Sequence, residues 1–162
     1  MSTIYKIRKA HAIIESLPRQ ELGALTKICR VLQSAQDDLI RIGNRFFHYC
    51  YQHCGGRCCN NIHVDDLLTL LDFIYILTLN PALLDKITAC AREETLYTGN
   101  CFFLEGGSGP CIFPPNQKPE RCIITFCQDT GPLKNEIRMI RGQFSRIFRF
   151  TALRRPIKVF GF

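Results

Sequence analysis

Long apolar runs are scarce in this sequence of 162 residues. The most apolar stretch, residues 67–79, is too short to span a bilayer and contains Asp72, so it predicts a buried helix. The basic N-terminal residues lead into an apolar run that stops at Glu15 without a small-residue cleavage pattern, so we expect no export signal. The sequence therefore predicts a cytoplasmic protein without membrane contact, in which thiols stay reduced.

Nucleotide-binding and repeat motifs are also absent from the sequence. No glycine fingerprint of a dinucleotide-binding fold or phosphate loop occurs, and the glycine-rich residues 106–109 lie between two cysteines, which is typical of a turn. The acidic pairs 65–66 and 93–94 fit helix ends and surfaces better than a catalytic dyad. The chain is also short for a complete SAM-dependent methylase, so we expect no catalytic activity of its own.

The composition is that of a globular protein, with 46% hydrophobic and 22% charged residues. A chain of this length can bury about two thirds of its unfolded surface in one core. We therefore predict a single domain, residues 1–162, of mainly α class. It would have a helical N-terminal part (1–49), a cysteine-cluster region (50–127) forming a loop-built metal-binding knot, and a basic amphipathic C-terminal helix with a tail (128–162).

Apolar residues recur at three- and four-residue steps along much of the chain, which predicts helices. Residues 18–46 read as one long helix, or as two in line with a break near Gly43, with Ser16 as a capping residue. Residues 65–79 read as the central core helix, and Pro81 begins a further helix that runs to Leu96.

The excess of positive charge lies at the C-terminal end. The formal charge is +7, and residues 133–162 hold eight basic residues against the single acid Glu136. Apolar residues at helical spacing, including Phe148, alternate there with Lys and Arg, whereas residues 157–162 read as an extended apolar tail. A solvated face over an apolar stripe is the plain reading of this helix, and the alternative is that it binds nucleic acid or a protein partner.

Ten cysteines are many for a globular chain, and eight of them form two clusters. The predicted metal ligands are Cys50, Cys54, Cys58, Cys59, Cys101, Cys111, Cys122 and Cys127. Eight thiolates match two zinc ions, one iron–sulfur cluster with spare thiols, or two clusters. Turn-forming residues dominate 99–119, so metal ligation would supply part of the free energy that orders this loop.

The other candidate ligands are more simply explained by packing or hydration. Cys29 and Cys90 fall on apolar helical stripes, where a thiol behaves as a small hydrophobe. His53 lies inside the first cluster and His63 follows it, and both are expected to be solvated residues near the site rather than ligands.

The cysteine spacing fits neither a zinc ribbon nor a ferredoxin run. It does resemble the YkgJ-type cysteine-cluster family of zinc- or iron-chelating domains. The first knot of that family reads Cys-x2-Cys-Gly-x-Cys-Cys, and residues 50–59 match it with slightly longer gaps. In the second half, 101–104 and 111–113 resemble the family's Cys-Pro-Phe-Leu and Cys-x-Ile-Tyr, and Cys122 and Cys127 keep the final spacing.

Two positions depart from the family pattern. Lys118 stands for the Arg of its Arg-Pro pair, and Ile123 stands for the Arg after the third Cys of the second half, which removes two donors near the metal ligands. The resemblance implies chelation without a settled activity. Some flagellin lysine methylases resemble enlarged members that carry an iron–sulfur cluster, which favours an iron–sulfur cluster over zinc.

Aromatic residues crowd the two clusters, as they would around a sheltered iron–sulfur cluster. They are Phe46, Phe47, Tyr49, Tyr51, Phe102, Phe103, Phe113 and Phe126. Two other functions remain open from the sequence: a zinc-stabilised interaction or nucleic-acid-binding module that uses the basic helix, and an accessory part of a methyl-transfer or redox enzyme.

Overall fold

The computed structural model of the chain confirms the mainly α prediction. It describes residues 1–44, 47, 59, 63–92, 100–107, 110–126 and 130–160. Within these ranges the regular elements are helices, and the β-structure is one isolated antiparallel bridge between Leu104 and Cys111. No helix in the described part of the chain is both long and apolar enough to cross a membrane.

The described helices follow the chain in this order: α1 (Thr3–Glu15), α2 (Arg19–Ile42), α4 (Val64–Leu67), α5 (Leu70–Leu79), α6 (Leu84–Arg92), α7 (Glu120–Ile124), α8 (Lys134–Arg154) and α9 (Pro156–Phe160). Three short 3-10 turns are η2 (Pro81–Leu83), η3 (Glu105–Gly107) and η4 (Gly131–Leu133).

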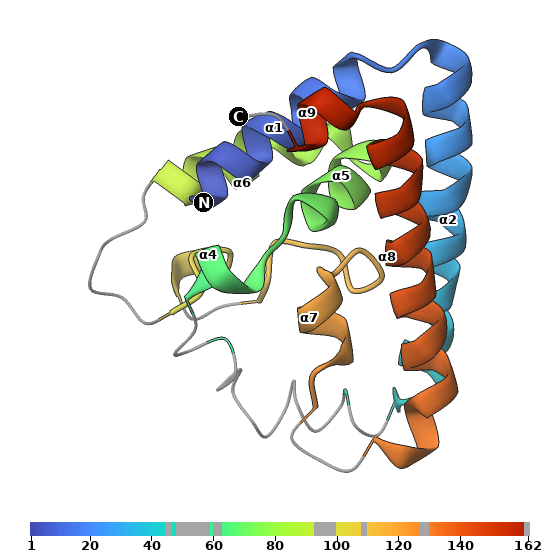
Figure 1. Cartoon of the computed structure of the whole chain (residues 1–162). Helices are drawn as coiled ribbons and strands as arrows, with labels where there is room; N and C mark the ends of the chain where they lie inside the picture. Colours follow the sequence, from blue (N-terminus) through green and yellow to red (C-terminus); the bar gives the residue numbers. More distant parts are fainter. Residues whose placement is uncertain are drawn as a thin grey trace.

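The two longest helices, α2 and α8, lie side by side along one edge of the molecule (Figure 1). Helix α5 packs against both of them and against α1, so it lies at the centre of the fold. Its residues Phe73 to Leu77 are all buried, as the apolar run predicts. The loop that carries the second cysteine cluster lies beside α5 and α7 (Figure 1).

Helix α2 agrees closely with its prediction. It ends at Ile42 before Gly43, and its buried face includes Leu25, Leu32 and Leu39. Ser16 differs from the prediction, because it follows the end of α1 and its Oγ donates to the carbonyl of Ile13 at 2.7 Å. Helix α1 lies within the helical N-terminal part predicted for residues 1–49, but its bounds were not predicted.

The predicted central helix of residues 65–79 is wrong in one respect: it is two helices, α4 and α5, that break at Leu68 and Thr69. Thr69 starts α5 with a capping box, because its amide donates to Asp72 Oδ2 at 2.7 Å while the Asp72 amide donates to Thr69 Oγ1. The Nζ of Lys6 on α1 donates to the carbonyl of Leu68 at 2.7 Å, which satisfies an acceptor at the break.

The next predicted helix, Pro81 to Leu96, starts as the 3-10 turn η2 and continues as α6 to Arg92. The last four residues of that prediction, 93–96, lie outside the described residues.

The C-terminal tail also differs from its prediction as an extended segment. Residues 156–160 form the helix α9, because Pro156 stands at the first helical position, where its fixed φ suits a helix. Helix α9 contacts both α8 and α1. Phe148, predicted on the apolar stripe of α8, is 42% exposed because it lies at the edge of the buried face.

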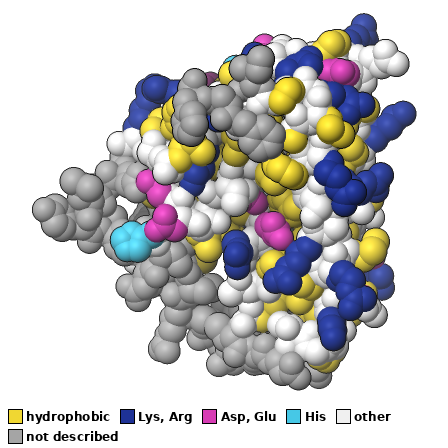
Figure 2. Space-filling model, in the orientation of Figure 1, with side chains coloured by type: hydrophobic (Ala, Val, Ile, Leu, Met, Phe, Trp, Pro, Cys, Tyr) yellow, Lys and Arg dark blue, Asp and Glu magenta, His cyan; other side chains and the backbone are white. Residues whose placement is uncertain are grey.

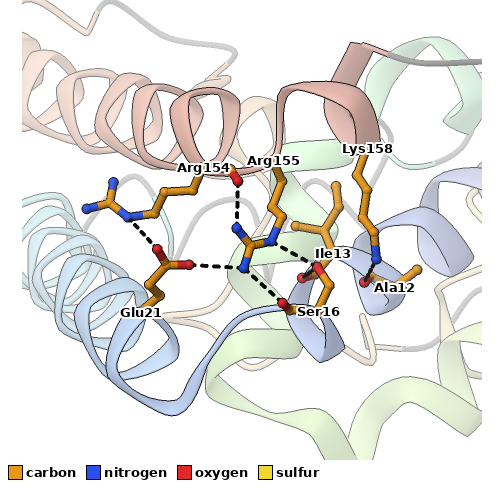
Figure 3. A network of polar contacts seen from close by, with 7 residues as sticks. All are labelled: Ala12, Ile13, Ser16, Glu21, Arg154, Arg155 and Lys158. Carbon is orange, nitrogen blue, oxygen red and sulfur yellow. Dashed lines mark hydrogen bonds and ion pairs between the residues drawn. The ribbon is translucent and has the colours of Figure 1, made fainter.

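Arg155 joins this C-terminal end to the corner between α1 and α2 (Figure 3). Its guanidinium donates to the carbonyl of Ser16 at 2.9 Å and to the Oγ of Ser16 at 3.3 Å, and it pairs with Glu21 at 3.1 Å. Arg154 adds a longer contact to the same carboxylate at 3.5 Å. Lys158 donates to the carbonyl of Ala12 at 3.3 Å. Three cations of the C-terminal segment therefore bind it to α1 and α2.

We expect Arg155→Ala to lower the free energy of unfolding by about 2 kcal/mol, because it removes several charge-assisted hydrogen bonds at once. Urea unfolding would measure the change. Arg149→Ala is the matched control on α8, since Arg149 is exposed, and it should change stability by less than about 0.5 kcal/mol. Equal effects of the two substitutions would show that the Arg155 network contributes nothing to stability.

Candidate metal centre

Four of the eight predicted ligands can be placed in the fold, namely Cys59, Cys101, Cys111 and Cys122. The other four, Cys50, Cys54, Cys58 and Cys127, lie outside the described residues, as does His53. His63 stands exposed immediately before α4.

A backbone hydrogen bond joins one described residue of each cysteine cluster. The amide of Cys101, the first residue of the second cluster, donates to the carbonyl of Cys59, the last residue of the first cluster, at 2.7 Å. Cys101 is buried and Cys59 is partly buried against the core. The last cysteine of the first cluster and the first cysteine of the second, which are far apart in the sequence, are thus neighbours in the fold.

A short hairpin-like loop then returns the chain from Cys101 to Cys111. The amide of Ile112 donates to the carbonyl of Phe103 at 2.9 Å, and the amide of Glu105 donates to the carbonyl of Pro110 at 2.9 Å. Gly106 at the turn has a φ of 62°, a conformation that favours glycine. The loop therefore holds Cys111 opposite Leu104, on the segment that starts at Cys101.

Buried polar side chains from the helices fix the rest of the loop. Gln36 of α2 exchanges two hydrogen bonds of 2.9 Å with the backbone of Lys118, one from its amide nitrogen to the carbonyl and one to its amide oxygen from the N–H. The hydroxyl of Tyr75 on α5 donates to the carbonyl of Asn116 at 2.8 Å. Gln36 and Tyr75 have no exposed surface, so these bonds exclude water.

Asp72 fixes the next segment, the start of α7. Its Oδ1 accepts from the amide of Glu120 at 2.7 Å, while its Oδ2 accepts from Thr69. Burial raises the pKa of Asp72, and these donors oppose the rise because they favour the carboxylate. One buried side chain thus caps α5 and also positions the helix that carries Cys122.

The thiols of the second cluster are close enough to influence one another electrostatically. Burial raises the pKa of Cys101 to about 11, and the charges of Cys111 and Cys90 add to the rise. Burial around the sulfur also raises the pKa of Cys122, although the residue as a whole has exposed surface, and Asp72, Cys111 and Cys101 contribute further. Cys101 and Cys122 therefore favour the protonated thiol.

Lys118 opposes the rise in the pKa of these thiols. Its charge lowers the pKa of both Cys101 and Cys122, because a nearby cation favours a thiolate. Its Nζ is held by the carbonyl of Phe113 at 2.8 Å. Lys118 is therefore a cation near these sulfurs, whereas Ile123 is buried and apolar.

Aromatic rings surround the same loop. The ring of Phe103 lies 4.6 Å from Phe102, 4.8 Å from Phe113 and 6.2 Å from Phe73, measured between centroids. Phe47 and Phe126 form an edge-to-face pair at 5.2 Å. The remaining predicted aromatics, Phe46, Tyr49 and Tyr51, lie outside the described residues.

The two cysteines predicted to be core residues differ in their surroundings. Cys29 is fully buried on α2, and burial raises its pKa to about 12, as for an inert packed thiol. Cys90 packs partly against the core, but it follows Lys86 by one turn of α6, and Lys86 pairs with Glu105 of the cysteine loop at 2.9 Å. Cys90 therefore lies on the α6 face nearest this loop.

The described side chains alone do not complete a metal site. No three His, Cys, Asp or Glu side chains within the described ranges are grouped closely enough to hold one ion. No family model, curated protein or solved structure matches the chain. The resemblance to the YkgJ-type family stays a prediction.

We expect Asp72→Ala to lower the free energy of unfolding by about 2–3 kcal/mol, because it removes the buried acceptor to which the amides of Thr69 and Glu120 donate. Asp66→Ala is the control, since Asp66 is an exposed acid in the same region, and its effect should stay below about 0.5 kcal/mol.

Hydrogen exchange would separate the local effect of Asp72→Ala from a general one. The Glu120 amide should exchange faster relative to the amides of α2 in this variant. Unchanged protection of Glu120 would show that Asp72 does not position α7.

Proposed function

We propose that the chain is a metal-binding cysteine-cluster protein that chelates iron, as an iron–sulfur cluster, or zinc through its eight clustered cysteines. The single observation that carries this proposal is the bond between Cys101 and Cys59, because it joins the ends of the two clusters. The electrostatic proximity of Cys101, Cys111 and Cys122 supports it further.

The ligands would be shared between the two clusters. Zinc and iron–sulfur clusters take four thiolates each, yet no three described ligands are grouped around one point. The described cysteines Cys59, Cys101, Cys111 and Cys122 would therefore be joined as ligands by Cys50, Cys54, Cys58 and Cys127. Two metal centres of four thiolates each would use all eight.

A bound metal would stabilise the thiolate forms, so that binding releases protons and adds to folding stability. The chain itself supplies two supporting features. Lys118 places a positive charge near the thiols, and the rings around Phe103 exclude water from the loop. An apolar, sheltered surrounding is what an iron–sulfur cluster needs, which favours iron.

Metal content should depend on the clustered cysteines and not on the packed one. Cys101→Ser should lose about half of the bound metal or more, because it removes one of four ligands from a centre. Cys29→Ala should keep full metal content, because Cys29 is buried on α2 away from the loop. The measurement is metal and acid-labile sulfide analysis, with an absorption spectrum, of anaerobically purified protein.

Iron with sulfide and broad visible absorption is the expected result, and a colourless protein with about two zinc ions per chain would instead assign zinc. Absence of both metals, or equal metal loss in Cys29→Ala, would contradict the proposal.

Metal removal should destabilise the protein. Chelation or Cys122→Ser should lower the melting temperature by about 10 °C or more, because structural metal binding contributes several kcal/mol to folding. Hydrogen exchange should rise more at residues 101–112 than at 116–120, since Gln36, Tyr75 and Asp72 hold the latter without metal. An unchanged melting temperature after complete metal loss would reject a structural role.

A further inference from the structure

The cations of the C-terminal segment fall into two groups. Arg154, Arg155 and Lys158 contact Glu21, Ser16 and Ala12, and thus hold the fold together (Figure 3). The second group is Lys134, Arg138, Arg141 and Arg149 on α8, all of them exposed. None of these four forms an ion pair with another residue that the structure describes.

The four exposed cations, which we call the α8 row, line up along the helix. At about 100° per residue they lie within an arc of about 80°, and at about 1.5 Å per residue they extend over roughly 22 Å. The buried residues Ile140, Phe144 and Ile147 lie on the opposite side. The row therefore faces straight out from the edge of the molecule that α8 forms, and Figure 2 shows Lys and Arg side chains gathered over that side.

Negative charge is sparse around the α8 row. The single acid on α8 is Glu136, which is half-buried. Arg141 acts electrostatically on the half-buried Glu120 of α7, beyond ion-pair distance. Arg146, beside the row, donates to Gln143 at 3.2 Å. The row is thus a line of positive charge that the described part of the protein does not neutralise.

We infer that the α8 row binds the sugar–phosphate backbone of a nucleic acid. Along the helix axis, successive members of the row are separated by about 6, 4.5 and 12 Å, and their long side chains let each reach a different phosphate of a strand that carries one charge per about 3.4 Å. Arginine is also suited to phosphate, because its guanidinium can donate two parallel hydrogen bonds. Such contacts fix position on the backbone and read no base sequence.

A lipid surface fits the α8 row less well. An interfacial helix buries an apolar face and keeps its cations to the side. Here the cations occupy the middle of the exposed face, whereas the exposed apolar residues lie on opposite flanks, Phe148 on one and Met139 and Leu153 on the other. No continuous apolar face remains on α8 for insertion into a bilayer.

The test compares two triple variants of the full chain that lose equal charge. Lys134→Ala, Arg138→Ala and Arg149→Ala remove three members of the row. The control removes Arg8, Arg19 and Lys27, which are exposed on α1 and α2. Fluorescence anisotropy with a labelled 20-nucleotide RNA, and with a DNA duplex, gives the dissociation constant over a series of salt concentrations. Unfolding curves confirm that both variants are folded.

The row variant should bind at least about tenfold more weakly near physiological salt, and its log–log salt slope should be shallower by about 2, as for the loss of three phosphate contacts. The control should change affinity by less than about threefold. Equal losses in the two variants would mean attraction by net charge alone and would overturn the inference. Absence of nucleic-acid binding by the unmodified chain would also overturn it. The same holds if phosphatidylserine vesicles or polyglutamate bind through the row and RNA does not compete with that binding.

Discussion

The anchoring of the cysteine loop to the helical core is the interaction on which the rest of the structure depends. Gln36, Tyr75 and Asp72 are buried helical side chains, and each bonds to the backbone of a residue between 116 and 120. Leaving any of these polar groups unpaired in the core would cost about 1–3 kcal/mol, so the loop is held at a defined distance from α2 and α5. The cysteines on either side of residues 116–120 are positioned by this arrangement.

This anchoring bears on the prediction that metal ligation orders the cysteine loop. The turn-rich composition of residues 99–119 predicted that ligation supplies part of the free energy that orders this loop. Contacts within the protein supply part of that ordering, because the buried side chains of Gln36 and Tyr75 hold the backbone of Lys118 and Asn116. If the cysteines bind metal as proposed, the part of the loop that is already held would bind with a smaller loss of conformational entropy.

The long amphipathic helices could be predicted from the sequence because their apolar residues recur every three or four positions along the chain. Helix α2 ends at Gly43, as expected, and the apolar stripe of α8 faces the core. Three features could not be read in this way. The bounds of α1 within the predicted helical N-terminal part could not be read, the break at Thr69 needs the capping box with Asp72, and α9 depends on its docking against α1.

The residues of the candidate site also differ in how far they could be predicted from the sequence. Cysteine spacing predicted eight ligands, and the structure describes four of them, of which Cys59 and Cys101 are joined by a backbone hydrogen bond. Gln36, Tyr75 and Asp72 carried no such signal, since each looks like an ordinary helical residue until its distant partner is known. Cys90 was predicted to be a core residue only because it lies on the apolar stripe of its helix. The ion pair between Lys86 and Glu105 places that helix beside the cysteine loop.

X-ray absorption at the iron and zinc edges of the anaerobically purified full chain tests the central claim most directly. The account predicts a first shell of sulfur alone, about four atoms near 2.3 Å from the metal, with a second metal neighbour if the centre is an iron–sulfur cluster. A first shell dominated by nitrogen or oxygen, or the absence of both metals at the edges, would contradict it.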